Sequence, residues 1–122
     1  MKRNKYTYKY RPEYGSDNYL LEFNIGPDNK IFISDLTNSL IEIKPTFEIV
    51  DELFVFDEIH MEMKSEIGLF DLWIDSWGLS FIMSEENQEG IKIINSILSK
   101  NMNFESIEVD KESYKYDKNA KR

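Results

Sequence analysis

Apolar and polar side chains alternate along residues 68–75, and no other feature of this 122-residue chain restricts its fold as strongly. Side chains of an extended strand point to opposite faces in turn. One face of this strand is apolar, and the other sets a large aromatic ring between two carboxylates: Phe70, Leu72 and Ile74 against Asp71, Trp73 and Asp75. The pattern predicts a strand with one face in a core and one face suited to binding.

A tight turn, a second strand over residues 79–83 and an amphipathic helix are expected next. Apolar side chains recur there at the spacing of one helix face: Ile91, Ile94 and Leu98. Ser84 is placed to cap this helix, because its hydroxyl can accept a hydrogen bond from an amide of the first turn. Gly90 weakens the first half of the helix, so the alternative is a helix that begins later in the chain. We expect this C-terminal helix to pack on one face of a sheet.

The rest of the chain is expected to be mainly strands. Alternation predicts strands over residues 5–10, 19–25 and 57–64, and we expect further strands over 30–35, 40–44 and 104–110, with a turn over 37–39. Residues 46–56 fit both a helical stripe and a buried strand, and we interpret them as a short helix or an irregular crossover. The result is one α+β domain over residues 1–122, an antiparallel sheet of hairpins and meanders without parallel crossovers.

The charge of the chain is unevenly distributed. The net charge is −8, but residues 12–110 hold 21 acidic side chains against five basic ones, whereas residues 1–11 and 111–122 are basic. An acidic field repels phosphate backbones and attracts basic proteins. It also keeps a protein in solution, which explains the charge without any partner. We expect no direct nucleic-acid binding, and mobile basic tails at residues 1–4 and 111–122.

Cysteine is absent, so the fold rests on packing and hydrogen bonds, and thiolate metal sites are excluded. No apolar run is long enough to span a bilayer, and no apolar segment follows the basic N-terminus as it would in a secretion signal. These features predict a soluble cytoplasmic protein that does not contact a membrane.

Signals of catalysis are weak. Glu58, His60 and Glu62 project from the same face of one predicted strand, and His and carboxylate side chains are metal ligands. The two glutamates, however, lie about 13 Å apart along an extended chain, which is too far for one metal ion. We therefore expect a solvated polar face there. Asp71 and Asp75 leave a glycosidase-like reaction conceivable, and no phosphate loop or nucleophile elbow is present. The sequence predicts a protein that is not an enzyme and needs no metal or cofactor.

Recognition of a partner is the function that the Trp73 strand favours. A tryptophan buried at the centre of an interface often costs about 2 kcal/mol or more when it is truncated to alanine. The predicted partner-binding residues are Asp71, Trp73, Asp75, Trp77, Glu58 and Glu62. The structural alternative is that Trp73 lies under the C-terminal helix or against the strand that contains Tyr6.

The segment WIDSWGLSFIM, followed by NQEGIKIINSIL, in a small acidic chain without cysteine, resembles the immunity proteins that bacteria encode beside polymorphic or contact-dependent toxins. The resemblance covers the latter half of the chain. It implies a protein that neutralises a cognate toxin domain, often a basic nuclease, by covering its active site or a neighbouring surface. The alternative is an interaction module without an inhibitory role, such as a homodimer that buries the Trp73 face.

Overall fold

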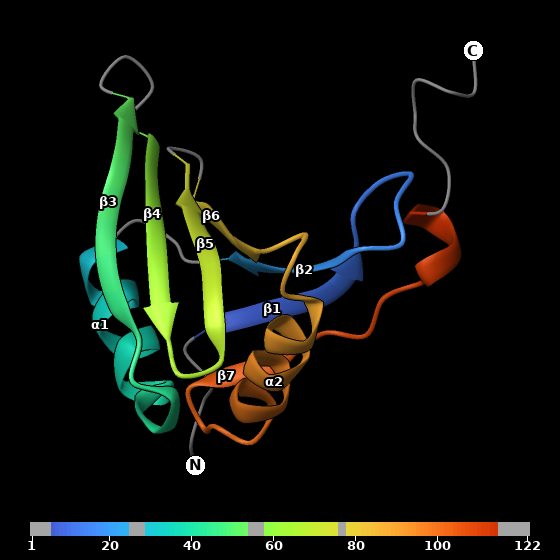
Figure 1. Cartoon of the computed structure of the whole chain (residues 1–122). Helices are drawn as coiled ribbons and strands as arrows, with labels where there is room; N and C mark the ends of the chain where they lie inside the picture. The colour runs from blue at the N-terminus through green and yellow to red at the C-terminus, as the bar shows by residue number, and fades with distance from the viewer. Residues whose placement is uncertain (1–5, 25–28, 54–57, 76–77, 115–122) are drawn as a thin grey trace.

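The structure, a computed structural model, describes residues 6–24, 29–53, 58–75 and 78–114, with only the backbone of Asn29 and of residues 47–53. Figure 1 shows the elements formed within these ranges. The strands are β1 (Tyr6–Pro12), β2 (Tyr19–Asn24), β3 (Thr46–Leu53), β4 (Glu58–Ser65), β5 (Gly68–Ile74), β6 (Leu79–Met83) and β7 (Phe104–Ser106). The helices are α1 (Asn29–Ser39) and α2 (Gln88–Ser99), with short 3-10 helices η1 (Ile41–Ile43) and η2 (Lys111–Tyr114).

All seven described strands form one sheet in the order β3-β4-β5-β6-β2-β1-β7. Neighbours are antiparallel except β1 and β7, so the prediction of an α+β fold with a mostly antiparallel sheet is confirmed. The expectation that the chain has no parallel crossover is wrong. Because β6 and β1 run in the same direction, and the helical connection through α2 returns the chain in the direction of β6, β7 lies parallel to β1.

Side chains from one face of the sheet form the core, and we call this side the core face and the opposite side the outer face. The core includes the apolar residues of β5 that alternation predicts, Phe70, Leu72 and Ile74. Two helices contribute to the same cluster of buried side chains: Phe32, Leu36 and Leu40 from α1 and the turn after it, and Ile91, Ile94 and Leu98 from α2. The outer face carries the side chains that alternate with these core residues.

Helix α1 replaces the predicted strand over 30–35 and the predicted turn over 37–39. Three fully buried residues recur at four-residue spacing, the spacing of one helix face: Phe32, Leu36 and Leu40. The hydroxyls of Thr37 and Ser39 donate to backbone carbonyls four residues earlier, at 2.8 Å each. These polar residues, which favour turns in a local prediction, therefore have their hydrogen bonds satisfied inside the helix.

Residues 46–53 form the edge strand β3, so the prediction of a short helix or irregular crossover there is wrong. Their apolar pattern fits both periods, and pairing with β4 decides between them. The predicted strand over 40–44 is instead η1, which ends at Lys44 in the left-handed region, with φ of 48°. The predicted last strand is shorter than expected, because β7 ends at Ser106.

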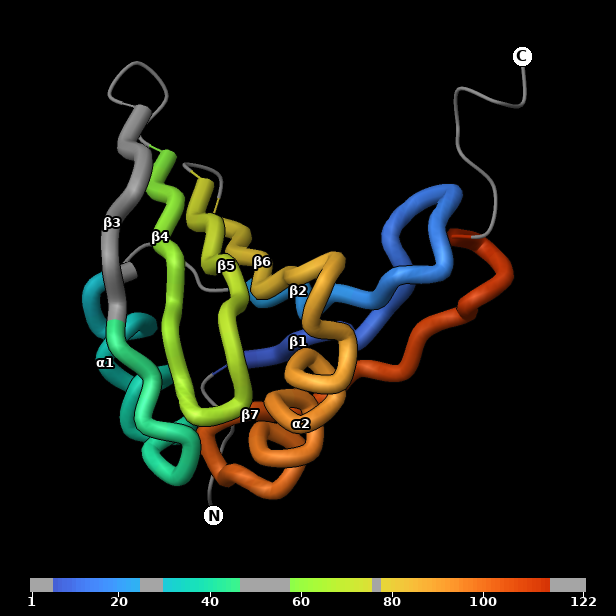
Figure 2. Tube along the Cα trace, in the orientation of Figure 1, coloured from blue at the N-terminus to red at the C-terminus, as the bar shows by residue number. Residues whose placement is uncertain are grey.

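The beginning of the predicted basic tail is ordered as η2. The backbone amide of Gly15 donates to the carbonyl of Tyr114 at 3.0 Å, and the Arg11 guanidinium lies 4.9 Å from the centre of the Tyr114 ring. Figure 2 shows η2 beside the loop that joins β1 to β2. The remaining residues of the predicted tails, 1–4 and 115–122, lie outside the described residues.

Helix α2 begins at Gln88, and its N-cap is Asn87 rather than the predicted Ser84. The Asn87 side chain accepts from the amide of Gly90 at 3.1 Å, which satisfies an amide of the first turn. Its amide nitrogen donates to the carbonyls of Ile67 and Leu69, at 3.0 and 3.1 Å. One side chain thus caps the helix and joins it to the β4–β5 hairpin.

We expect Asn87→Ala to lower the free energy of unfolding by about 1–3 kcal/mol, because it removes a helix cap and two further hydrogen bonds. Asn38→Ala is the matched control, since Asn38 is exposed on α1. That substitution should change stability by less than about 0.5 kcal/mol. Urea unfolding followed by circular dichroism measures both values, and equal effects of the two substitutions would contradict the double role of Asn87.

Candidate functional site

Strand pairing aligns the outer-face residues of β4, β5 and β6 into two rows. In the first row His60 pairs with Trp73, and Trp73 pairs with Phe81. In the second row Glu62 pairs with Asp71, and Asp71 pairs with Met83. Side chains directly opposite each other on one sheet face lie close enough to interact. The outer face therefore has an aromatic row next to a row that contains two carboxylates.

Trp73 is half-buried and lies outside the core cluster. Its ring stacks on the His60 ring, with centroids 4.2 Å apart and planes 16° apart. Leu72 and Ile74, its neighbours in the chain, are buried on the core face. The alternative in which Trp73 is enclosed beneath the C-terminal helix or against the Tyr6 strand therefore does not describe this structure.

The second ring nitrogen of His60 lies beside Asp71. His60 Nε2 is 3.2 Å from Asp71 Oδ1, yet Nε2 has no partner in hydrogen-bond geometry among the described residues. The contact is therefore a close approach without a hydrogen bond, because a short distance alone does not make one. His60 thus supports the Trp73 ring by stacking and lies beside the carboxylate of Asp71.

A hollow of about 350 Å³, which we call the apolar hollow, lies over the aromatic row. It is lined by Glu58, Trp73, Ile74, Asp75, Phe81 and Met83. The carboxylate of Asp75 also has a local role, because its Oδ1 accepts from the backbone amide of Leu79 at 3.0 Å and closes the turn before β6. Glu58 and Asp75 thus place negative charge at the border of an otherwise apolar surface.

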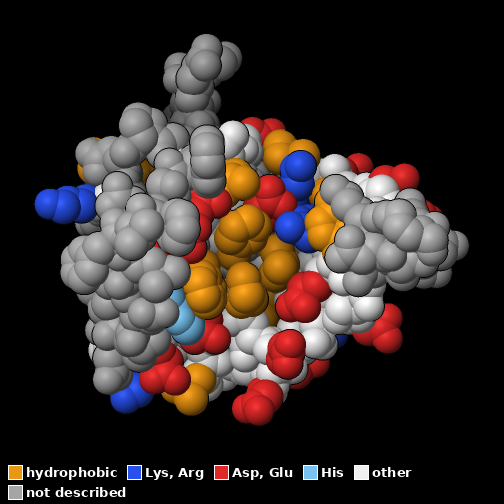
Figure 3. All heavy atoms as spheres, turned by 90° about the horizontal axis from the view of Figure 1, so that it is seen from above, with side chains coloured by type: hydrophobic (Ala, Val, Ile, Leu, Met, Phe, Trp, Pro, Cys, Tyr) orange, Lys and Arg blue, Asp and Glu red, His pale blue; other side chains and the backbone are white. Residues whose placement is uncertain are grey.

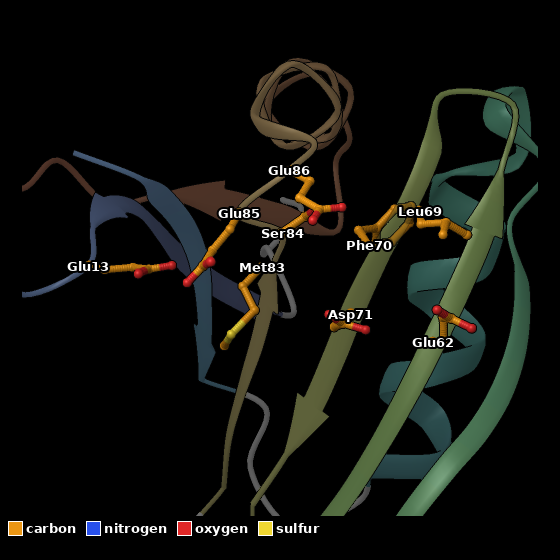
Figure 4. Close-up of a pocket in the computed structure, with 9 residues that line it drawn as sticks. All are labelled: Glu13, Glu62, Leu69, Phe70, Asp71, Met83, Ser84, Glu85 and Glu86. Carbon is orange, nitrogen blue, oxygen red and sulfur yellow. The ribbon is translucent and has the colours of Figure 1, made fainter. Parts of the chain in front are cut away.

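A second hollow, of about 450 Å³, adjoins the first at Met83, and we call it the acidic hollow (Figure 4). Its lining is Glu13, Glu62, Leu69, Phe70, Asp71, Met83, Ser84, Glu85 and Glu86. Five of these residues carry a carboxylate, and none of the described residues that line it is a lysine or arginine. Figure 4 shows Glu13 and Glu85 pointing toward one another from different segments of the chain.

Hydrogen bonds of the next two residues, Asn87 and Gln88, hold the segment that carries Glu85 and Glu86 against two neighbouring elements. On one side Asn87 bonds the β4–β5 hairpin. On the other, Gln88 Oε1 accepts from the amide of Tyr19 at 2.8 Å, and Gln88 Nε2 donates to the carbonyl of Tyr19 at 3.1 Å. These bonds join the start of α2 to β2 and to the hairpin, so the two glutamates are placed before any partner arrives.

The charges around the acidic hollow repel one another. Burial raises the pKa of the Glu13 carboxyl, the charge of Glu85 raises it further, and the nearby Arg11 guanidinium lowers it. Arg11 itself is committed elsewhere, because its Nε donates to Glu22 Oε1 at 2.6 Å. The ionised form of Glu13 is therefore disfavoured in the folded protein.

Hydrophobic side chains gather at the bottom of a depression on this side of the molecule, and Asp and Glu side chains lie around them, with Lys and Arg side chains along one part of the border (Figure 3). An apolar centre with a charged border is the usual anatomy of a protein-binding surface. Apolar contact and charged groups are therefore available together on this side of the molecule.

Most of the predicted site residues come together on the outer face. Asp71, Trp73, Asp75, Glu58 and Glu62 all line one or other hollow. Trp77 lies outside the described residues.

The other residues that line the two hollows were not predicted from the sequence, among them Phe81, Met83, Glu13 and Glu85. Alternation over residues 79–83 places Phe81 and Met83 on one face, but their opposite neighbours, Ser80 and Ile82, form the buried face. A buried serine beside an outward phenylalanine reverses the usual preference. For Glu13 and Glu85, no local signal indicates that they meet.

Models of protein families, curated proteins and solved structures were compared with the chain, and none matches. In the described part of the chain, no three His, Asp or Glu side chains are grouped closely enough to hold a metal ion. Over the same residues, no helix has the length and apolar character needed to cross a membrane.

We expect Glu13→Gln to raise the free energy of unfolding at pH 7. A carboxyl whose pKa is raised on folding destabilises the native state above that pKa, and this penalty is absent below the unfolded pKa. The gain should therefore disappear at pH 3, below the ordinary value of 4.5. Urea unfolding at both pH values tests this, with Glu108→Gln, an exposed residue, as control. An equal gain at both pH values would show that charge is not the cause.

Proposed function

We propose that this protein binds a positively charged protein through the outer face of its sheet and neutralises it, as an immunity protein does with a bacterial toxin. The observation that carries the proposal is the contact between the two hollows. An apolar surface around Trp73 and Phe81 continues through Met83 into a hollow lined by five carboxylates. Apolar anchoring and charge recognition are thus available on one surface.

The chemistry of this surface favours a protein over other partners. Tryptophan is one of the residue types enriched among those that contribute most to protein binding. Carboxylates repel the phosphates of nucleic acids and attract lysine and arginine. A basic nuclease domain, whose own active site attracts phosphate, has the complementary charge, and a protein seated on it would block access to the substrate.

In the proposed arrangement the C-terminal helix covers the core face, and the partner binds the outer face. We propose that the protein acts in the cytoplasm, because a fold without cysteine does not depend on disulfides, which are rare in that reducing compartment. A role as a non-inhibitory module or homodimer is the alternative. Pairing of two outer faces would bring the carboxylates of Glu62, Asp71 and Glu85 near those of a second copy, which costs free energy.

Trp73→Ala should increase the dissociation rate of the complex with the toxin about 30-fold, the equivalent of about 2 kcal/mol for a central aromatic residue. The toxin to use is the domain encoded by the neighbouring reading frame. Surface plasmon resonance measures the rates, and Ile41→Ala, a 65% exposed apolar residue on η1, is the matched control and should leave them unchanged. Circular dichroism checks that each variant is folded.

The inhibitory role has a separate readout. One equivalent of the protein should abolish the activity of the toxin, and Trp73→Ala should restore activity at the same concentration. Unchanged toxin activity at stoichiometric protein, or a neighbouring reading frame that encodes no toxin, would contradict the inhibitory role. Light scattering that finds a dimer, with Trp73→Ala converting it to a monomer, would favour the homodimer instead.

Glu62→Gln combined with Asp71→Asn should lower the association rate by about tenfold at low salt, because opposite charge accelerates the encounter of two proteins. The difference from the unmodified protein should shrink as NaCl rises to about 0.5 M, since salt screens charges at the surface. Glu42→Gln combined with Glu108→Gln removes the same charge from exposed positions outside the two hollows. Equal slowing by both pairs would assign the effect to net charge and not to this surface.

A further inference from the structure

We infer that the outer face receives two side chains of one partner segment, an arginine or lysine in the acidic hollow and an apolar side chain in the apolar hollow. This inference rests on the proposed function and specifies the chemistry that the partner presents. It commits to an extended protein segment in which the cationic and the apolar residue are two positions apart.

The lining of the acidic hollow fits a long cationic side chain. Leu69, Phe70 and Met83 provide apolar walls, against which the methylene stem of arginine or lysine can pack. The carboxylates of Glu13, Asp71 and Glu85 provide acceptors for the charged head, and charge-assisted hydrogen bonds of this kind are among the strongest in proteins. A small inorganic cation would leave the apolar walls without a contact.

The separation of the two hollows follows from strand geometry. Asp71 and Trp73 are two residues apart on β5, and Met83 and Phe81 are two residues apart on β6, paired with them in register. Two residues of an extended chain span about 7 Å. A partner segment that is itself extended presents side chains i and i+2 on one side with the same spacing, so both hollows can be filled at once.

The acidic hollow is prearranged for this ligand. Among the described residues, Glu13, Glu62, Glu85 and Glu86 have no ion-pair partner. Asn87 and Gln88 hold the segment that carries Glu85 and Glu86 against the hairpin and β2. Since these carboxylates repel one another in the free protein, a cation that enters the hollow is attracted by them and also removes their mutual repulsion.

The probe for this inference is the peptide Ac-Ala-Arg-Ala-Leu-Ala-NH2, titrated into the full-length protein and followed by NMR. We expect shifts of the backbone amides of Asp71, Met83 and Glu85 and of the indole N–H of Trp73. Replacing arginine with citrulline, which has the same shape without the charge, should weaken binding about tenfold or more. The peptide Ac-Ala-Arg-Leu-Ala-Ala-NH2 moves leucine to the other side of an extended chain, and it should shift the acidic hollow but lose the Trp73 response.

The protein variants test the same pairing from the other side. Glu13→Gln combined with Glu85→Gln should weaken binding of the arginine peptide about tenfold and leave the citrulline peptide unaffected. Glu42→Gln combined with Glu108→Gln, which changes the net charge equally at exposed positions outside the hollows, should change neither. Removing the two hollow carboxylates relieves repulsion, so the first pair is expected to fold at least as stably as the unmodified protein.

The outcomes separate this inference from the proposed function. Equal binding of the arginine and citrulline peptides, or no response at the acidic hollow, overturns the two-side-chain arrangement. If Trp73→Ala still accelerates dissociation of the toxin in that case, the proposed function stands. If the arginine peptide binds as expected but no toxin is inhibited, the surface recognises basic segments and the inhibitory role fails.

Discussion

The alternation of side chains across the paired strands β4, β5 and β6 is the constraint on which the rest of the structure depends. Burial of Met61, Leu72 and Ile82 on the core face forces the intervening residues of all three strands onto the outer face. A slip of one residue in any strand would exchange the two faces. The core and the outer face are therefore two consequences of one register, and neither can be changed without the other.

The outer face combines features that are costly for an isolated protein. Phe81 faces outward while the Ser80 hydroxyl is buried and donates to the carbonyl of Trp73 at 2.9 Å. Glu13 and Glu85 are held near each other although their charges repel. Local arrangements that lower stability in this way are common where a fold serves binding. Here the hydrogen bonds of Asn87 and Gln88 at the edge of the hollow stabilise the surrounding structure. Five of the acidic side chains of this protein are thus gathered around one hollow, in addition to the general effect of negative charge on solubility.

The predictability of each element follows from how local its determinants are. The strand with Trp73, its neighbour over 79–83 and the apolar stripe around Ile94 were predictable, because hydrophobic periodicity within the segment sets them. Helix α1 was not predicted, since residues 37–39 are turn formers in a local prediction, whereas contact of Phe32 and Leu36 with the core favours the helix. The strand β3 depended in the same way on pairing with β4.

Residue identities alone place Asp71 and Trp73 on one face of a strand and make the central part of the chain strongly acidic. Both follow from residue identity and a two-residue period, which need no knowledge of distant contacts. Only the tertiary structure decided that Glu13 joins Glu85 and Asp71 around one hollow, because sheet order brings together segments far apart in the chain. It also decided that Phe81 lies beside Trp73, since register between strands is a property of the pairing and not of either strand.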